Sequence, residues 1–184
     1  EHKTPDGYQF FLNLGPLRNV NEKFFKGKID FWNKMAEHPN YDEFWQSRSI
    51  LPYLNSVTCT VLTVGGWYDA EDLYGPLEIY KTVEKNNPAI TNTLVMGPWF
   101  HGGWVRGEGD SLGDTPFDFP TAKYFQKEVM LPLFLAKLKE KDDPELPEAL
   151  VFETGANRWR EFDSWPPPST EKTLYFNKGQ SLTF

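Results

Sequence analysis

Two loops of this sequence combine glycines with a residue that can hold or transfer a proton. The first loop, Gly-Gly-Trp-Tyr-Asp, ends at Asp69, and the second, Met-Gly-Pro-Trp-Phe-His, ends at His101. A carboxylate that accepts a hydrogen bond from an imidazole fixes its tautomer, and the ring can then take a proton from a serine and return it to a leaving group. Asp69 and His101 are therefore candidates for the carboxylate and imidazole members of a serine-hydrolase triad.

Each of these residues also has an ordinary explanation. An Asp after a strand is usually a turn former or a helix cap, and a lone His in a loop is usually structural or on the surface. Their spacing adds weight to the catalytic interpretation, because 32 residues and one strand–helix–strand unit separate them. This agrees with the order Ser…Asp…His along the chain of an α/β-hydrolase.

The elements that must position Asp69 and His101 have a βαβ pattern. Residues 57–64 and 93–96 are apolar and rich in β-branched residues, which predicts two strands, and residues 72–83 have the spacing of a helix. This order implies a parallel sheet with a right-handed crossover. Ligands collect at the carboxyl ends of such strands, which lie ~4.8 Å apart, so we expect the two side chains to meet.

The flanking regions predict loops and helices. Residues 1–22 contain several Pro and Gly residues and predict a loop, and residues 24–38 predict a helix that ends before Pro39. Residues 121–139 predict a long helix that Pro132 kinks.

The pattern of predicted elements changes after the charged, proline-containing segment 141–147. Short strands are predicted at residues 150–154 and 172–176, with a proline-rich turn between them. We expect these strands to belong to a separate β-rich unit rather than to the parallel sheet. Two strands alone do not form a stable sheet, so the chain is expected to be cut from a longer one.

Composition excludes several function classes. The net charge is −7, the pI is about 5.0, and the 19 basic residues form no stripe, which argues against a nucleic-acid partner. No apolar run is long enough for a membrane span, and the first residues do not read as a signal peptide. The single Cys59 excludes an internal disulfide and a cysteine-cluster metal site, and its apolar surroundings predict a buried thiol.

A literal Gly-x-Ser-x-Gly pattern occurs at Gly109, Ser111 and Gly113. A nucleophile elbow needs a strand before it and a helix after it, and it precedes the triad's Asp and His in an α/β-hydrolase. No strand is predicted before this pattern, which also follows His101. We therefore interpret the pattern as an ordinary glycine-rich loop and not as a nucleophile elbow.

Four ordered motifs resemble those of a known family. They are Gly-Gly-Trp-Tyr-Asp, Leu-Val-Met-Gly-Pro-Trp-x-His, Tyr-Asp-Glu-Phe-Trp and Phe-Glu-Thr-Gly-x-Asn-x-Trp, and they extend over nearly the whole chain. The chain resembles the cocaine esterase and X-Pro dipeptidyl peptidase-like serine hydrolases (CocE/NonD). Within these it is most similar to the α-amino acid ester hydrolases and the glutaryl 7-aminocephalosporanic acid acylase-like proteins.

The resemblance implies an α/β fold in three modules. Residues 1–52 would be the end of a helical cap, residues 53–140 the last strands and helices of the α/β-hydrolase core, and residues 141–184 a linker and the first strands of a β-sandwich (jelly roll). Asp69 and His101 fall on the family's triad positions.

The implied reaction is cleavage or transfer of an ester or amide acyl group through an acyl-enzyme, without a metal or organic cofactor. The family's Gly-x-Ser-Tyr-x-Gly elbow is not in this sequence, so this chain alone is expected to be inactive. The resemblance also implies a small-molecule substrate and a periplasmic or secreted location, and it leaves open a homo-oligomeric parent.

Substrate-binding residues are predicted in two places. Asp42 and Glu43 lie near the region expected to bind a substrate ammonium group, although Asp42 has the position of a helix cap and Glu43 that of a solvated helix start. Trp67 and Tyr68, together with Trp99, flank the triad residues and would line an acyl pocket, with core packing as the alternative.

The aromatic content, 16% of the residues, also supports a rival function. A non-catalytic carbohydrate- or surface-binding module would place its aromatic rings on an exposed strand face, whereas an acyl pocket would gather them around Asp69 and His101.

Overall fold

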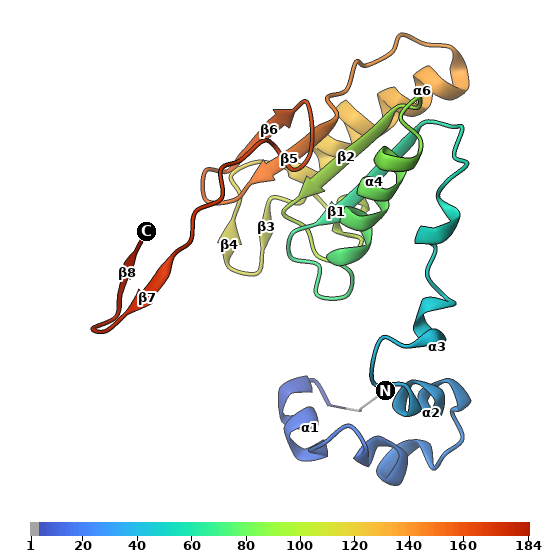
Figure 1. The fold of residues 1–184 in the computed structure, drawn as a ribbon, viewed down its shortest axis with the longest axis vertical. Coiled ribbons are helices and arrows are strands. Elements are labelled where there is room, and N and C mark those ends of the chain that lie inside the picture. Colours follow the sequence, from blue (N-terminus) through green and yellow to red (C-terminus); the bar gives the residue numbers. More distant parts are fainter. Residues whose placement is uncertain (1–3) are drawn as a thin grey trace. The chain divides into compact units, whose positions relative to one another are not determined.

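A computed structural model describes residues 4–184, and the contacts between residues divide the chain into the units Glu1–Ile50 and Leu51–Phe184. Figure 1 shows the order of the elements in both units.

The first unit is helical. Its elements are α1 (Gly7–Leu14), a π-helical turn η1 (Asn21–Phe25), α2 (Asp30–Glu37) and the short α3 (Glu43–Gln46). The prediction of a loop over residues 1–22 is therefore wrong in part, because α1 lies within it. Asp6 caps α1 by accepting a hydrogen bond from the N–H of Gln9 at 2.8 Å, a start signal that the sequence carries.

The helix predicted over residues 24–38 is two elements. The backbone takes positive φ at Lys26 (52°) and Gly27 (73°), a conformation that ends a helix. Helix α2 begins only at Asp30 and ends at Glu37, just before Pro39.

The second unit is built on a four-stranded sheet with the order β1-β2-β5-β6. Strands β1, β2 and β5 are parallel, and β6 is antiparallel to β5. The crossover between β1 and β2 is helix α4 (Tyr74–Asn86), which confirms the predicted βαβ unit. The strands are β1 (Val61–Gly66), β2 (Asn92–Gly97), β5 (Ala149–Glu153) and β6 (Arg158–Phe162).

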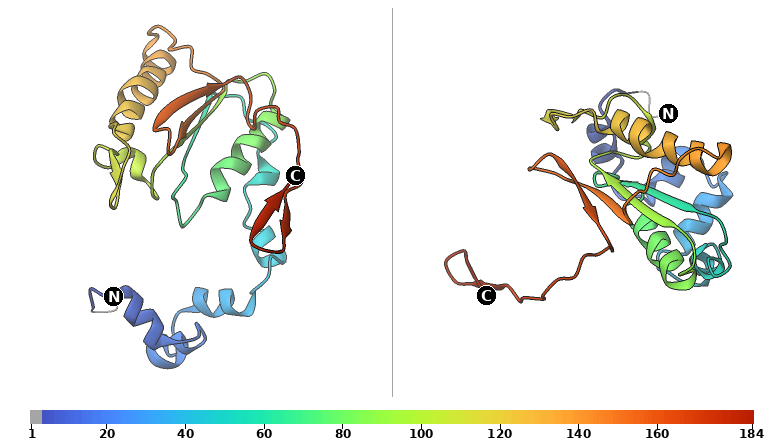
Figure 2. Two further views of the ribbon diagram at one scale, coloured as in Figure 1. Left: turned by 90° about the vertical axis from the view of Figure 1, so that its left-hand side faces the viewer. Right: turned by 90° about the horizontal axis from the view of Figure 1, so that it is seen from above.

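Helices cover both faces of this sheet, as the left view of Figure 2 shows for α4 and α6. Strand β2 explains why, because its residues are buried on both sides: Leu94 and Met96 join a cluster with Tyr80 of α4. Val95 points the other way and packs with Phe125 in the second helical layer. The sheet is thus buried as parallel sheets generally are.

The second layer is one long irregular helix, as predicted. It comprises α5 (Thr121–Tyr124), a π-helical segment η4 (Phe125–Met130) and α6 (Leu131–Lys139). The irregular segment ends two residues before Pro132, which has no N–H to donate to the preceding turn. Short turns η2 (Leu51–Tyr53) and η3 (Gly103–Val105) and a small hairpin, β3 (Ser111–Leu112) with β4 (Thr115–Pro116), complete the core.

The first predicted strand begins later than expected. It starts at Val61 rather than at Val57, whose N–H donates instead to the side-chain oxygen of Asn87 at 2.9 Å. Cys59 therefore lies outside the strand and its thiol is exposed, so the prediction of a buried cysteine is wrong.

The strand predicted at residues 150–154 does not belong to a separate unit. It is β5, and Leu94, Val95 and Met96 of β2 pair in parallel with its residues 149–151. A short apolar strand carries no local signal of its pairing partner, which is why the change of pattern at the linker was misleading. The predicted boundary between core and β-sandwich does not hold for β5 and β6.

The last strands, β7 (Tyr175–Asn177) and β8 (Ser181–Thr183), pair only with each other and lie apart from the four-stranded sheet in Figure 1. Their assignment to a jelly roll stays a prediction.

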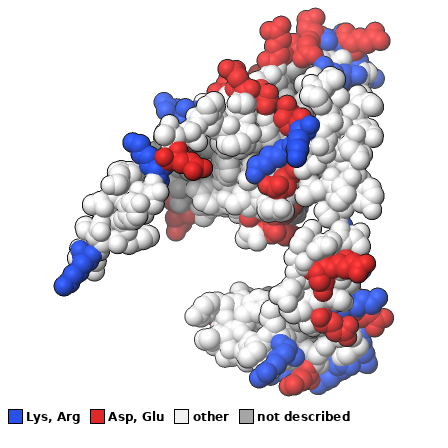
Figure 3. Space-filling view, in the orientation of Figure 1, with Lys and Arg blue, Asp and Glu red and all other residues white. Residues whose placement is uncertain are grey.

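No helix in residues 4–184 is long and apolar enough to cross a membrane. Lys and Arg are interspersed with Asp and Glu on the face shown in Figure 3.

Candidate functional site

The loops after β1 and β2 are joined by backbone hydrogen bonds beyond the strands themselves. Trp67 donates its N–H to the oxygen of Gly97 at 2.9 Å, and Tyr68 donates to the oxygen of Trp99 at 3.1 Å. The approach requires Gly66, because a Cβ there would lie 2.1 Å from the oxygen of Trp99. The Gly-Gly-Trp sequence thus brings the two loops together.

Asp69 and His101 meet at the ends of these loops. His101 Nδ1 lies 2.9 Å from Asp69 Oδ2, and Asp69 Oδ1 accepts hydrogen bonds from the N–H groups of Glu71 and Asp72, both at 2.9 Å. The Asp69 side chain is 3% exposed and that of His101 is 52% exposed. The predicted contact is confirmed: a buried, oriented carboxylate holds an imidazole that is open on its other side.

The neighbouring groups lower the pKa of Asp69 and raise the pKa of His101, and both changes favour the charged pair. The N–H of Asp72 is the main cause that lowers the pKa of Asp69, and the N–H of Glu71 and the His101 hydrogen bond act in the same direction. The hydrogen bond to Asp69 raises the pKa of His101, with a further contribution from the Glu71 charge, whereas burial and Arg106 oppose the rise. The imidazole is therefore a stronger base than a free histidine.

Glu71 is the residue that sequence reasoning missed. Its Oε2 lies 3.7 Å from His101 Nε2, and its side chain is 75% exposed. The run Asp69-Ala-Glu-Asp places this second carboxylate two residues after Asp69, which is the sequence signal that could have indicated it. Since Nδ1 faces Asp69, Nε2 is the nitrogen left for a reacting group, and Glu71 adds negative charge there.

The flanking aromatic residues divide into packing and exposed side chains. Trp99 is 2% exposed, and the indole N–H of Trp67 donates to the oxygen of Phe152 at 3.1 Å. These contacts favour the packing alternative for both tryptophans. Tyr68 is different, because it is 44% exposed and stacks on Phe117 with ring centroids 6.3 Å apart. A pocket-lining role for Tyr68 stays a prediction.

Asp42 and Glu43 lie in the other unit. Asp42 caps α3 by accepting from the N–H of Phe44 at 3.0 Å, and its second oxygen lies 2.6 Å from His38 Nδ1. The His38 hydrogen bond is the main cause that lowers the pKa of Asp42. Both oxygens of Asp42 thus have local partners, while Glu43 is exposed at the helix start. Ammonium binding by either residue stays a prediction.

Ser111 is not placed as a nucleophile. It lies in the β3–β4 hairpin, which no helix follows directly, and its side chain is exposed. Its hydroxyl contacts Asp110 at 3.4 Å. Among the described residues, no serine hydroxyl bonds to His101.

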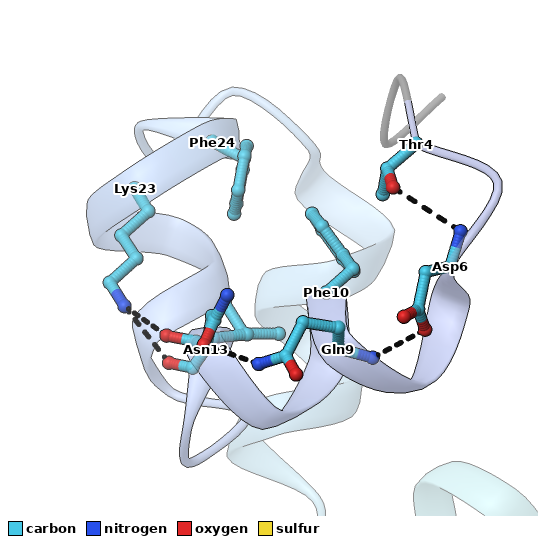
Figure 4. A pocket seen from close by; sticks show the side chains of 8 residues that line it. Thr4, Asp6, Gln9, Phe10, Asn13, Lys23 and Phe24 are labelled. Carbon is cyan, nitrogen blue, oxygen red and sulfur yellow. Dashed lines mark hydrogen bonds between the residues drawn. The ribbon is translucent and has the colours of Figure 1, made fainter.

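Figure 4 shows a pocket of about 440 Å³ in the first unit. Its polar groups are satisfied locally: Lys23 Nζ donates to the oxygens of Asn13 and Leu14, and Gln9 donates to the Asn13 side chain. No set of three or more His, Cys, Asp or Glu side chains in residues 4–184 is placed to hold a metal ion.

Known proteins resemble this chain in sequence and in structure. Cocaine esterase from Rhodococcus sp. (strain MB1 Bresler) is 27% identical over 83% of this chain, which spans 26% of that protein. A solved aminopeptidase from a marine sediment Thaumarchaeota archaeon superposes with a TM-score of 0.87 at 35% identity, covering 97% of this chain and 30% of its own. An α-amino acid ester hydrolase also superposes with a TM-score of 0.87, at 28% identity, over 98% of this chain and 31% of its own.

The chain thus spans less than a third of the length of these relatives. The model of one family matches residues 3–103, which include Asp69 and His101. The chain belongs to the X-Pro dipeptidyl-peptidase (S15) family.

Proposed function

We propose that Asp69 and His101 are the carboxylate and the general base of a serine hydrolase whose nucleophile lies outside this chain. The observation that carries the proposal is the pair itself: a 2.9 Å contact between a buried carboxylate and a half-exposed imidazole at the ends of adjacent parallel strands. Ligands in open parallel sheets collect at this edge. The family relationship to peptidases and esterases supports ester or amide hydrolysis.

The geometry assigns a role to each nitrogen of His101. Nδ1–H donates to Asp69, so neutral Nε2 can take the proton of a serine hydroxyl as its oxygen attacks the carbonyl carbon of the substrate. The imidazolium then gives this proton to the departing alcohol or amine, which leaves an acyl-enzyme. A water molecule attacks the acyl carbon in the second half, and His101 again takes and returns a proton.

We infer that substrates carry a positive charge near the acyl group. The exposed carboxylate of Glu71 lies 3.7 Å from Nε2 and would attract such a group. The two superposed structures are an aminopeptidase and an α-amino acid ester hydrolase, whose names indicate substrates with an α-amino group. Glu71 supports this substrate class better than Asp42, whose oxygens have partners within their own unit.

The rival function, a binding module, has less support. It requires tryptophan or tyrosine rings on an exposed strand face, but Trp67 and Trp99 pack in the core of the second unit. Exposed rings do occur on β7, where Tyr175 is 57% and Phe176 is 90% exposed. Within residues 4–184, no ring contact joins Tyr175 or Phe176 to Trp67 or Trp99.

The test compares three proteins on the nitrophenyl ester of an α-amino acid and on its N-acetylated form. The intact protein should hydrolyse the free-amine ester with a burst of nitrophenol, and more slowly after acetylation. This chain alone, and the intact protein with His101→Ala, should not. Equal rates for the intact protein and its His101→Ala variant would refute the triad, and equal rates on both esters would refute the substrate class.

A further inference from the structure

A buried hydroxyl holds Trp99, which lies two residues before His101. The indole Nε1 of Trp99 donates to Thr121 Oγ1 at 2.9 Å, and Thr121 Oγ1 donates in turn to the backbone oxygen of Gly109. Thr121 is fully buried and Trp99 is 2% exposed. The burial of Trp99 and Thr121 makes the indole N–H depend on the Thr121 hydroxyl for its hydrogen bond. The partly buried Gly109 oxygen also accepts the backbone N–H of Thr121 at 3.3 Å.

Trp99 connects these hydrogen bonds to the candidate site. Its backbone oxygen accepts the N–H of Tyr68, the neighbour of Asp69, and its ring packs on Phe125 with centroids 5.5 Å apart. A shift of Trp99 would therefore move the loop that carries His101 relative to the loop that carries Asp69.

The far end of the His101 loop is tied to the same helix start. The oxygen of Glu108 accepts the N–H of Ala122 at 3.0 Å, directly beside Thr121. Gly109 has φ of 72°, and a Cβ there would lie 2.6 Å from the nitrogen of Ala122. The start of α5 thus anchors the loop at Trp99 on one side of His101 and at Gly109 on the other.

We propose that Thr121 is a positioning residue, whose hydroxyl sets the place of the His101 imidazole against Asp69 through Trp99 and Gly109. The catalytic consequence rests on the proposed function, whereas the effect on the imidazole does not. Thr121→Val keeps the shape of the side chain and leaves the buried indole N–H of Trp99 unpaired, whereas the Gly109 oxygen keeps the backbone N–H of Thr121 as a donor at 3.3 Å. A buried donor without a partner is unfavourable, so we expect the Trp99 ring to move.

The first experiment titrates the His101 imidazole by NMR in this chain, with the signal assigned through His101→Ala. Thr121→Val should lower the pKa of His101 toward the ordinary histidine value, because the contact with Asp69 that raises it is loosened. Thr121→Ser keeps the hydroxyl and should titrate like the parent chain. An unchanged pKa in Thr121→Val would overturn the proposal.

A matched control is Thr63→Val in β1. Thr63 is also buried, but its hydroxyl has no hydrogen-bond partner among the described residues. This variant should leave the His101 titration unchanged. If Thr63→Val lowered the pKa as much as Thr121→Val, the effect would be general loosening of the core, and the proposal would fail.

The second experiment measures kinetics in the intact protein. Thr121→Val should lower kcat by about 10- to 100-fold with KM within about twofold, since a small misplacement of a catalytic group has this size of effect. Thr121→Ser should restore most of kcat. If Thr121→Val does not fold, Trp99→Phe removes the donor instead and should give the same change. A melting temperature that falls while kcat stays unchanged would show a merely structural hydroxyl.

These outcomes separate the two proposals. The proposed triad is refuted if His101→Ala is as active as the wild type, whatever the activity of Thr121→Val. Failure of the positioning role is shown when His101→Ala is inactive and Thr121→Val has normal kcat and a normal His101 titration.

Discussion

The two units each contain an aspartate in contact with a histidine, and the two pairs differ in almost everything else. His38 and Asp42 are four residues apart and lie 2.6 Å from each other, whereas His101 and Asp69 are 32 residues apart and lie 2.9 Å from each other. The shorter contact belongs to the pair with the weaker claim to catalysis. Distance alone therefore does not identify the site.

Burial and preorganisation distinguish the pairs. The Asp69 side chain is 3% exposed, and two N–H groups fix the oxygen that His101 does not use. The Asp42 side chain is 43% exposed, and its cap and its histidine belong to one local turn. The Asp69 carboxylate is held by backbone N–H groups of the loop after β1 and is buried away from water, where electrostatic stabilisation is strongest.

The comparison predicts its largest contrast for the two histidines. His101→Ala in the intact protein should lower kcat by about 10⁶-fold, because the general base is lost. His38→Ala should change kcat by no more than about threefold, as removal of an exposed local pair does little. Ester hydrolysis by both purified variants is the measurement, and a large loss in His38→Ala would reverse our assignment.

The aspartates should differ almost as much. Asp69→Asn should lower kcat by about 10⁴-fold, since an amide at this position favours the wrong imidazole tautomer. Asp42→Asn should have little effect, because asparagine also caps helices well. If the two variants were equally active, orientation of His101 by Asp69 would not matter for catalysis.

The pH dependence should follow the Asp69–His101 pair. Activity requires neutral His101, so kcat/KM should rise with pH through a pKa above the ordinary value of about 6.5. Residual activity in Asp69→Asn should show this rise at lower pH. The raised pKa of His101 contributes stability that is fully present below about pH 6.5 and is lost as pH rises through the folded-state pKa. The lowered pKa of Asp69 contributes stability that is present above about pH 4 and is lost as pH falls through the folded-state pKa.

Thermal unfolding from pH 3 to 9 checks the second part of this prediction. The stability difference between the wild type and Asp69→Asn should be largest between about pH 4 and 6.5, where both contributions are present. A stability difference between the two proteins that stays constant over the whole measured range of pH would contradict the pKa directions.

The contrast extends to the glycines of the two units. Gly66→Ala should destabilise the fold by about 1–3 kcal/mol, because the added Cβ would lie 2.1 Å from the oxygen of Trp99. Gly7→Ala, in α1, meets nothing within 4 Å and should be neutral or stabilise by up to about 1 kcal/mol. Urea unfolding of this chain measures both values, and a neutral Gly66→Ala would show that the loops can separate.

The smallest effect is expected at the serine that mimics an elbow. Ser111→Ala should leave the activity of the intact protein within about twofold, because its hydroxyl is exposed in a hairpin. Abolished activity would identify Ser111 as the nucleophile and would remove the need for one outside this chain.

The sequence by itself determined the local arrangement of the site. Alternation of β-branched strands with a helical pattern fixed the βαβ unit, and Asp69 and His101 follow its two strands. Parallel strands end at the same edge, so their contact could be predicted without coordinates. The cap at Asp42 was equally readable, because N-caps act within one turn.

Tertiary structure decided what depends on partners far along the chain. Strand β5 was predicted as part of another unit, since its sequence of apolar residues fits a sandwich as well as a parallel sheet; only its pairing with β2 decides. The sequence likewise does not show the packing of Trp67 and Trp99 or the hydrogen bonds that join Trp99, Thr121 and Gly109. Each joins residues whose distance is set by how helices and loops pack on the sheet, and no local periodicity encodes that distance.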